Sequence, residues 1–199
     1  MEKKQIVAAF DFDGTLTTHD TLLAFIRFVR GTPLFLWGFL LYSPLLIACK
    51  LKLYPNRQVK QQLFSFFFKG MRLADFDRFC DEFGRKFIYL LRSEAISAVK
   101  KHLANGDSIV IISASIENWV RPFAERLGVS DVLCTKLEVD HEGRLAGRFA
   151  SANCYGAEKV RRLLQLYPHR EAYYLVAYGD SEGDRELLAL ADEAFYRKF

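Results

Sequence analysis

The sequence predicts an α/β protein: a Rossmann-like doubly wound parallel sheet with an inserted all-helical cap domain. Two observations predict this fold. Apolar runs of strand length alternate with helical patterns from residue 93 onward, as expected of strands joined by crossover helices. One more apolar run opens the chain, and the residues that separate it from residue 93 read as helix. We therefore divide the chain into a core, residues 1–20 and 92–199, and a helical cap, residues 21–91.

The first element is an apolar run, residues 6–10, that leads directly into two carboxylates, Asp11 and Asp13, and then into Gly14. Because side chains alternate along a strand, the two carboxylates would point the same way if the strand continued. Gly14 allows the chain to turn away from the sheet. Acidic pairs in loops are usually only solvated. Two acids at the carboxyl end of a buried strand, however, need a cation or a proton between them, and they predict a functional site.

The next segment is expected to be helical from Asp20 or Thr21 to Gly31. Residues 31–49 then carry no charge, and as one helix they would nearly cross the ~30 Å core of a bilayer. A single crossing would separate Asp11 from the polar residues that follow the later strands, and Pro44 would kink the helix. We therefore expect a helical hairpin, either packed in the protein or lying in a membrane interface. Helices over residues 56–68 and 73–90 complete the cap.

Charge is unevenly distributed. Residues 21–74 hold eight of the 28 Lys and Arg residues and none of the 24 Asp and Glu residues, so the remainder, with 20 basic and 24 acidic residues, is net negative. This pattern favours a peripheral contact of the cap with an anionic membrane, and it gives no indication of nucleic-acid binding.

The cysteines indicate the compartment. Cys49, Cys80, Cys134 and Cys154 lie far apart, without a Cys-x-x-Cys pair, which favours free, buried thiols. The first apolar run is interrupted by Asp11, so we do not expect it to be a signal peptide. We expect a cytoplasmic protein, with association at the inner face of the membrane left open.

The α/β part continues in a regular order. Strands are expected at residues 108–112 and 173–178, a β-hairpin at 132–139 and 144–149, and an edge strand at 194–196; helices are expected at residues 94–103, 117–127, 158–166 and 185–191. These elements place four further polar residues near strand ends or early in a helix: Ser113, Lys159, Asp180 and Asp184.

These residues suit one chemistry. The Ser113 hydroxyl and the Lys159 ammonium could hold an anion, and the crowded carboxylates, Asp11 and Asp13 with Asp180 and Asp184, suit a hard cation with oxygen ligands, most simply Mg²⁺. Singly, Ser113 reads as a helix cap and Lys159 as a surface lysine. The combination, in this order and after these elements, predicts a phosphate-handling site.

The order of these motifs resembles the haloacid dehalogenase superfamily of hydrolases, and the inserted cap is similar to that of its subfamily IB, which includes the phosphoserine phosphatases. The resemblance implies that Asp11 is the nucleophile and that Asp13 is the general acid and base. It also implies that Mg²⁺ is held by Asp11, the Asp13 carbonyl, Asp180 and Asp184, and that Ser113 and Lys159 stabilise the transferring phosphoryl group. An acid at position 13 favours a phosphatase over a dehalogenase.

The resemblance is weaker for the residues that would bind the substrate. Asp20, Arg57 and Ala114 occupy or approximate positions that contact the substrate in phosphoserine phosphatases, whereas the apolar and basic cap is similar to that of phosphatidylglycerophosphatases of type C. We therefore expect a Mg²⁺-dependent phosphatase that acts on a lipid phosphate such as phosphatidylglycerophosphate. A small soluble phosphomonoester such as phosphoserine, a phosphotransferase, and a non-catalytic membrane-interaction module on the same fold are the alternatives.

Overall fold

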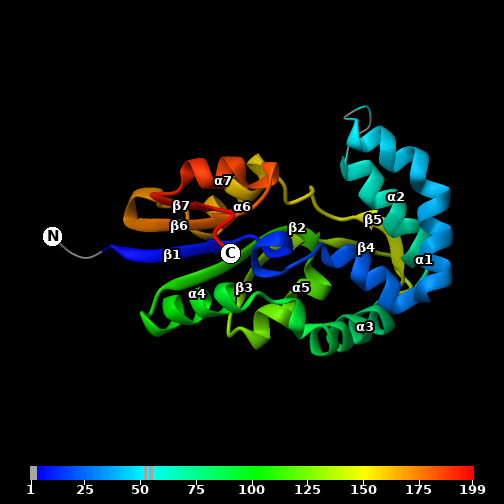
Figure 1. The fold of residues 1–199 in the computed structure, drawn as a ribbon, viewed down its shortest axis with the longest axis horizontal. Helices are drawn as coiled ribbons and strands as arrows, with labels where there is room; N and C mark the ends of the chain where they lie inside the picture. The colour runs from blue at the N-terminus through cyan, green and yellow to red at the C-terminus, as the bar shows by residue number, and fades with distance from the viewer. Residues whose placement is uncertain (1–3, 52, 54–55) are drawn as a thin grey trace.

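The structure, a computed structural model, describes residues 4–51, 53 and 56–199. Its main sheet has five parallel strands in the order β3-β2-β1-β6-β7 (Figure 1). The strands are β1 (Gln5–Phe10), β2 (Ser108–Ile116), β3 (Asp131–Thr135), β6 (Tyr173–Gly179) and β7 (Glu193–Tyr196). The chain therefore winds from β1 outward in both directions, and the predicted doubly wound parallel sheet and its edge strand are confirmed.

Helices cover both faces of the sheet. α4 (Ser93–Ala104) and α5 (Glu117–Arg126) lie on one face, and α6 (Ala157–Leu166) and α7 (Arg185–Leu190) lie on the other (Figure 1). β1 serves both layers because its side chains alternate: Phe10 packs in the cluster that contains Phe123 of α5, and Ala9 packs in the cluster that contains Leu163 of α6. A central strand buried on both faces explains why β1 is apolar throughout its second half.

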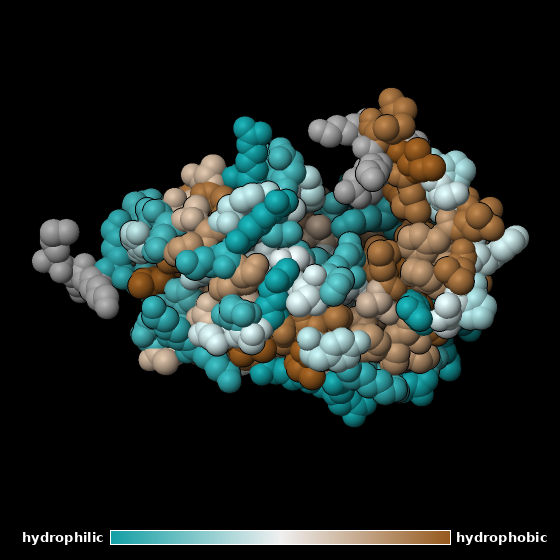
Figure 2. All heavy atoms as spheres, viewed as in Figure 1, coloured by the Kyte–Doolittle hydropathy of each residue, from teal (hydrophilic) through white to brown (hydrophobic). Residues whose placement is uncertain are grey.

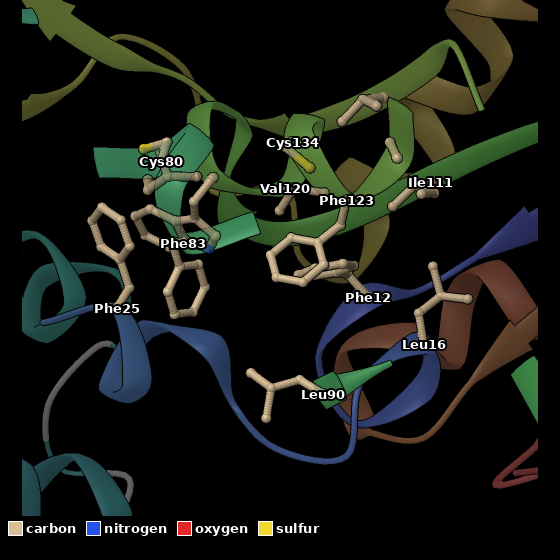
Figure 3. Packing of buried hydrophobic residues seen from close by; sticks show 14 of the residues in the cluster. Phe12, Leu16, Phe25, Cys80, Phe83, Leu90, Ile111, Val120, Phe123 and Cys134 are labelled. Atoms are coloured by element: carbon tan, nitrogen blue, oxygen red, sulfur yellow. The ribbon is translucent and has the colours of Figure 1, made fainter. Parts of the chain in front are cut away.

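The helical insertion shares its hydrophobic core with the sheet. It comprises α1 (Thr21–Lys50), α2 (Asn56–Phe68), α3 (Leu73–Lys86) and a 3₁₀ turn (Ile88–Leu90). A continuous series of aromatic contacts runs from Phe25 of α1 to Phe83 of α3 (5.3 Å between ring centroids), then to Phe123 of α5 (5.7 Å) and Phe12 after β1 (5.4 Å) (Figure 3). Edge-to-face pairs of this kind each add about 1 kcal/mol beyond area burial. The division of the chain into core and cap stays a prediction.

The helical hairpin expected within residues 31–49 is wrong. Gly31 breaks the helical geometry (φ 75°, ψ 163°), but α1 then resumes and passes Pro44 without reversing. Pro44 removes the hydrogen bond to the carbonyl of Leu40, and the Ser43 hydroxyl donates to that carbonyl instead (2.8 Å). The partner of this helix is α2: a side chain at Gly38 would clash with Phe67, so the two helices lie in close contact.

The strand predicted over residues 132–139 is divided. β3 joins the main sheet beside β2, and β4 (Leu137–Val139) separately pairs antiparallel with β5 (Leu145–Phe149). The chain leaves the sheet after Thr135, whose hydroxyl bonds to the Ala114 carbonyl (3.1 Å). β5 instead lies against α2, where Gly147 (φ 78°) leaves room for Ser65. The β4–β5 hairpin therefore packs beside the helical insertion.

Smaller differences concern element ends and side chains. The strand predicted to stop at residue 112 continues as β2 to Ile116, with an irregular register beyond Ser113. Cys80, Cys134 and Cys154 are free and buried as predicted, whereas the side chain of Cys49 lies outside those described. Among the described residues, one helical segment, Thr21–Ile47, is long and apolar enough to cross a membrane, and only 17% of its most apolar window is buried.

Candidate active site

The site lies where β1 and β6 end, beside β2. Phe10 pairs with Ile111 of β2 and with Tyr178 of β6, so the residues that follow these three lie at the same edge, although β2 itself continues to Ile116. The Asp11 amide still donates to the Tyr178 carbonyl (2.9 Å), which holds Asp11 beside the loop after β6. Because the direction of strand order changes at β1, this edge forms the crevice in which doubly wound sheets bind ligands.

A buried ammonium joins two of the predicted acids. Lys159, near the start of α6, lies with its Nζ 2.5 Å from Asp11 Oδ1 and 2.5 Å from Asp184 Oδ1, and all three side chains are buried. Burial raises the pKa of Asp11 to about 7, although the positive charge of Lys159 opposes this shift. Burial disfavours charged Lys159, but the two carboxylates outweigh it and raise the lysine pKa. Lys159 is therefore held as a cation at the strand ends.

A group of three carboxylates can hold a metal ion. Asp11, Asp180 and Asp184 each offer an oxygen, and these atoms all lie within 4.8 Å of one another. One ammonium cannot balance three carboxylates, and burial, with Asp184 adding to it, raises the pKa of Asp180. Gly14 makes the group compact, since a Cβ there would lie within 3.0 Å of all three Asp180 carboxyl atoms. The all-oxygen donor set fits Mg²⁺.

Asp184 is fixed by its own loop. Its Oδ2 accepts hydrogen bonds from the Asp180 amide (3.2 Å), the Ser181 amide (3.0 Å) and the Ser181 hydroxyl (2.8 Å). With Oδ2 occupied in this way, Oδ1 is left to face Lys159. Such anchoring would hold a carboxylate oxygen in place for a metal ion.

Asp13 is not part of the three-carboxylate group and has its own hydrogen-bond partners. Its Oδ1 accepts from the Thr21 amide (2.7 Å) and hydroxyl (2.6 Å), and its Oδ2 accepts from the Ser115 hydroxyl. Burial raises the pKa of Asp13, and the negative charge of Asp20 adds to this shift. A carboxyl that stays protonated more readily than usual suits a general acid.

Ser113 lies at the same edge of the sheet. It is buried two residues beyond Ile111, within β2 and not at its end, and its hydroxyl accepts from the Ser115 amide (3.1 Å). The order acid pair, Ser, Lys, acid pair in the sequence therefore corresponds to one crevice in space.

The three residues predicted to contact a substrate occupy different surroundings. Asp20 is exposed and caps α1 by accepting from the Leu22 amide (2.9 Å). Arg57 is exposed and donates to the Ser151 carbonyl (3.4 Å). Ala114 lines a cavity between the insertion and the core, together with Lys60 and Trp119. Lys60, which the sequence did not single out, is the charged residue of this cavity. Roles for Asp20, Arg57 and Ala114 stay predictions.

Several residues of the site were not predicted. Thr15 donates to Asp180 (3.3 Å), Ser181 holds Asp184, and Thr21 and Ser115 hold Asp13. Thr15 follows Gly14 directly, so its place next to the acid pair could have been used to predict it as a site residue. The other three are ordinary polar residues whose partners are identified only by the folded chain.

Comparison with known proteins gives a consistent result. A family model described as haloacid dehalogenase-like hydrolase matches residues 8–189. Protein CicA of Caulobacter vibrioides is 36% identical, over all of this chain and 89% of CicA. A solved structure of a protein of unknown function from Bordetella pertussis Tohama I has a TM-score of 0.80 at 24% identity, covering 94% of this chain and 87% of that one. A substrate-bound phosphoserine phosphatase has a TM-score of 0.67 at 18% identity, covering 96% and 84%, and shares the fold.

Proposed function

Because this chain belongs to the haloacid dehalogenase-like hydrolase family, we propose that it hydrolyses a phosphate monoester through an aspartyl-phosphate formed on Asp11. The family and the phosphatase class predicted from the sequence are both confirmed by this membership. The observation that carries the proposal further is the arrangement of Lys159, which lies 2.5 Å from both Asp11 and Asp184 at the crevice of the sheet. A cation here, beside a carboxylate nucleophile, is suited to a dianionic phosphoryl group.

The reaction proceeds in two steps. A carboxylate oxygen of Asp11 forms a bond to phosphorus while the bond from phosphorus to the leaving oxygen breaks, and the Asp13 carboxyl gives its proton to that oxygen. Asp13, now a carboxylate, then removes a proton from a water molecule that attacks the same phosphorus and releases Asp11. Lys159 and Ser113 stabilise the negative charge on the transferring group.

A metal ion completes this site. Asp11, Asp180, Asp184 and the Asp13 carbonyl would hold Mg²⁺, which when bound offsets the charge of the phosphoryl oxygens and of the crowded carboxylates. The protein residues align the nucleophile and exclude water from it, as the burial of Asp11 and Asp184 supports.

The favoured substrate is a lipid phosphate such as phosphatidylglycerophosphate, met by a cytoplasmic protein at the inner face of an anionic membrane. The support is the outer face of α1, where Leu36, Trp37, Leu40, Leu41 and Ile47 are each more than half exposed. A soluble phosphomonoester such as phosphoserine is the second candidate, and it is supported by the fold shared with a phosphoserine phosphatase.

The proposal is tested by release of inorganic phosphate from purified protein with Mg²⁺. We expect release from dispersed phosphatidylglycerophosphate to exceed release from phosphoserine, and excess chelator to stop both. Faster release from phosphoserine would contradict the lipid substrate, and full activity in chelator would contradict the metal. Phosphate transfer to an added alcohol in preference to water would identify a phosphotransferase. Inactivity on every phosphate ester would leave the non-catalytic membrane module.

A further inference from the structure

The carboxylate of Asp13 is held from both sides. The Thr21 amide and hydroxyl lie 2.7 and 2.6 Å from Oδ1, and the Ser115 hydroxyl donates to Oδ2. Thr21 and Ser115 come from different parts of the chain: Thr21 is the first residue of α1, and Ser115 lies at the end of β2. Both are buried, so water does not compete for these bonds.

Trp119 sets the direction of the Thr21 hydroxyl. The indole Nε1, which can only donate, lies 3.2 Å from Thr21 Oγ1 and occupies one of its acceptor positions. The single hydroxyl proton of Thr21 is then directed at Asp13 Oδ1. Trp119 is itself fixed, because it is buried and stacks on Phe25 of α1 at 5.0 Å.

This arrangement distinguishes the two oxygens of Asp13. A carboxylate has about four acceptor positions, and Thr21 occupies both of those on Oδ1. Ser115 occupies one on Oδ2, which leaves the other position on Oδ2 open. Ser115 also lines the small cavity between the insertion and the core, together with Lys60 and Ala114.

We propose that Thr21, Ser115 and Trp119 are positioning residues that aim Asp13 Oδ2 at the leaving-group oxygen. The inference rests on the proposed function, in which Asp13 supplies the proton. In the first step the proton on Oδ2 moves to the ester oxygen as its bond to phosphorus breaks; in the second, Oδ2 takes a proton from the attacking water. Because Oδ2 is already held in one orientation, less entropy is lost on reaching the transition state, and the barrier to proton transfer is lower. The first turn of the helical insertion thereby becomes part of the proton-transfer apparatus.

The test compares esters whose leaving groups need a proton to different extents. p-Nitrophenolate is a stable anion that leaves without being protonated, whereas an alkoxide must receive a proton as it leaves. Thr21→Val removes the hydroxyl and keeps the shape. We expect it to lower kcat/KM at least about tenfold for the faster of phosphatidylglycerophosphate and phosphoserine, and much less for p-nitrophenyl phosphate. Thr21→Ser, which keeps the hydroxyl, should restore the ratio between the two esters.

Three further variants make the result decisive. Ser115→Ala removes a single hydroxyl. It should also lower kcat/KM more for the alkyl ester than for p-nitrophenyl phosphate, even if Thr21→Val folds poorly. Thr18→Val makes the same exchange on an exposed side chain of the same segment and should leave both rates unchanged. Equal losses for both esters, or no loss, in Thr21→Val and Ser115→Ala would overturn the positioning role. Asp13→Asn distinguishes failure of the proposed function from failure of the positioning role. If Asp13→Asn does not slow the alkyl ester more than p-nitrophenyl phosphate, the proposed role of Asp13 as the proton donor is wrong, and the positioning role is wrong with it.

Discussion

At the scale of single residues, the site depends on one buried cation among carboxylates. Lys159 contacts both Asp11 and Asp184, and all three side chains are buried, so water screens these charges poorly. A buried ion pair adds little net stability compared with apolar residues, but removal of one partner leaves the other charges buried and uncompensated. Lys159 should therefore affect folding as well as catalysis.

Lys159→Met is expected to lower the free energy of unfolding by about 3 kcal/mol at pH 8 in chelator. Asp11 already has its pKa raised to about 7 with Lys159 present, and loss of the lysine raises it further. A carboxyl with a raised folded-state pKa is destabilising while ionised, so the deficit relative to the wild type should shrink as the pH falls from 8 through 7, below which Asp11 is protonated in both folded proteins. Urea unfolding at pH 8 and pH 5 measures this. Lys136→Met, at a side chain 67% exposed, is the matched control, and a deficit independent of pH would contradict the assignment.

The nucleophile provides a second prediction at this scale. Asp11→Asn is nearly isosteric, and we expect it to abolish phosphate release while the protein stays folded, because an amide cannot form the acyl phosphate. Mass spectrometry of wild-type protein quenched during turnover should locate the labile phosphate on the peptide containing Asp11. Turnover by a pure Asp11→Asn sample would rule out the covalent role.

At the scale of elements, α1 has two different faces beyond Gly31. Phe35 and Phe39 are half-buried and pack against each other with tilted rings (4.6 Å between ring centroids), and Gly38 lies against α2. The opposite face exposes Trp37 (60%) and Leu40 (67%) to solvent. Figure 2 shows apolar residues gathered at the end of the molecule where α1 lies in Figure 1. An apolar outer face of this extent on a basic segment is typical of a surface that binds a protein or a membrane.

The combined change of Trp37, Leu40 and Ile47 to Gln should reduce binding to anionic vesicles about tenfold or more, because each side chain would lose its burial in the interface. The fold should tolerate it, since these side chains are at least 60% exposed. Co-sedimentation measures binding, and thermal unfolding measures stability. Tyr89→Gln, at a side chain 68% exposed outside α1, should change neither.

The dependence of vesicle binding on salt and on lipid charge provides a second test. Wild-type binding should weaken as salt is raised and should favour anionic over neutral vesicles. Negligible binding of the wild type to both vesicle types would reject the membrane contact and favour the soluble substrate. Phe39 is unsuitable for this experiment because its change would disturb packing as well as exposure.

At the scale of the whole molecule, the candidate metal-binding group is assembled from segments that are distant in sequence. Asp11 follows β1 at the centre of the sheet, and Asp180 and Asp184 follow β6 beside it, so all three oxygens converge only in the folded chain. A ligand that binds only the folded state stabilises it in proportion to the logarithm of its concentration.

Mg²⁺ is therefore expected to raise the Tm of the wild type, with a stabilisation of about 1.4 kcal/mol when its concentration is tenfold above Kd. Asp180→Asn removes a ligand and should abolish the shift. Asp81→Asn, an exposed acid on α3, should retain it. Differential scanning fluorimetry across a Mg²⁺ titration gives the readout. An unchanged shift in Asp180→Asn would remove Asp180 from the metal site.

The sequence alone determined the family, the class of fold and most of the charged residues that meet at the candidate site. These depend on local patterns: an apolar run that ends in Asp11 and Asp13, and another that ends near Asp180 and Asp184. Parallel strands bring their carboxyl ends to one edge, so local patterns suffice to place these residues together.

The tertiary structure alone decided which polar side chains hold the acids and which apolar side chains stay in contact with water. Thr21, Ser115 and Ser181 bond to Asp13 and Asp184 because of where α1, β2 and the loop after β6 meet. The continuation of α1 past Pro44 is supported by one hydroxyl and by contact with α2, and the division of β3 from β4 depends on where the sheet ends. Hydrophobicity is a property of the residue, but burial is a property of its neighbours, and neighbours distant in sequence are settled only by packing.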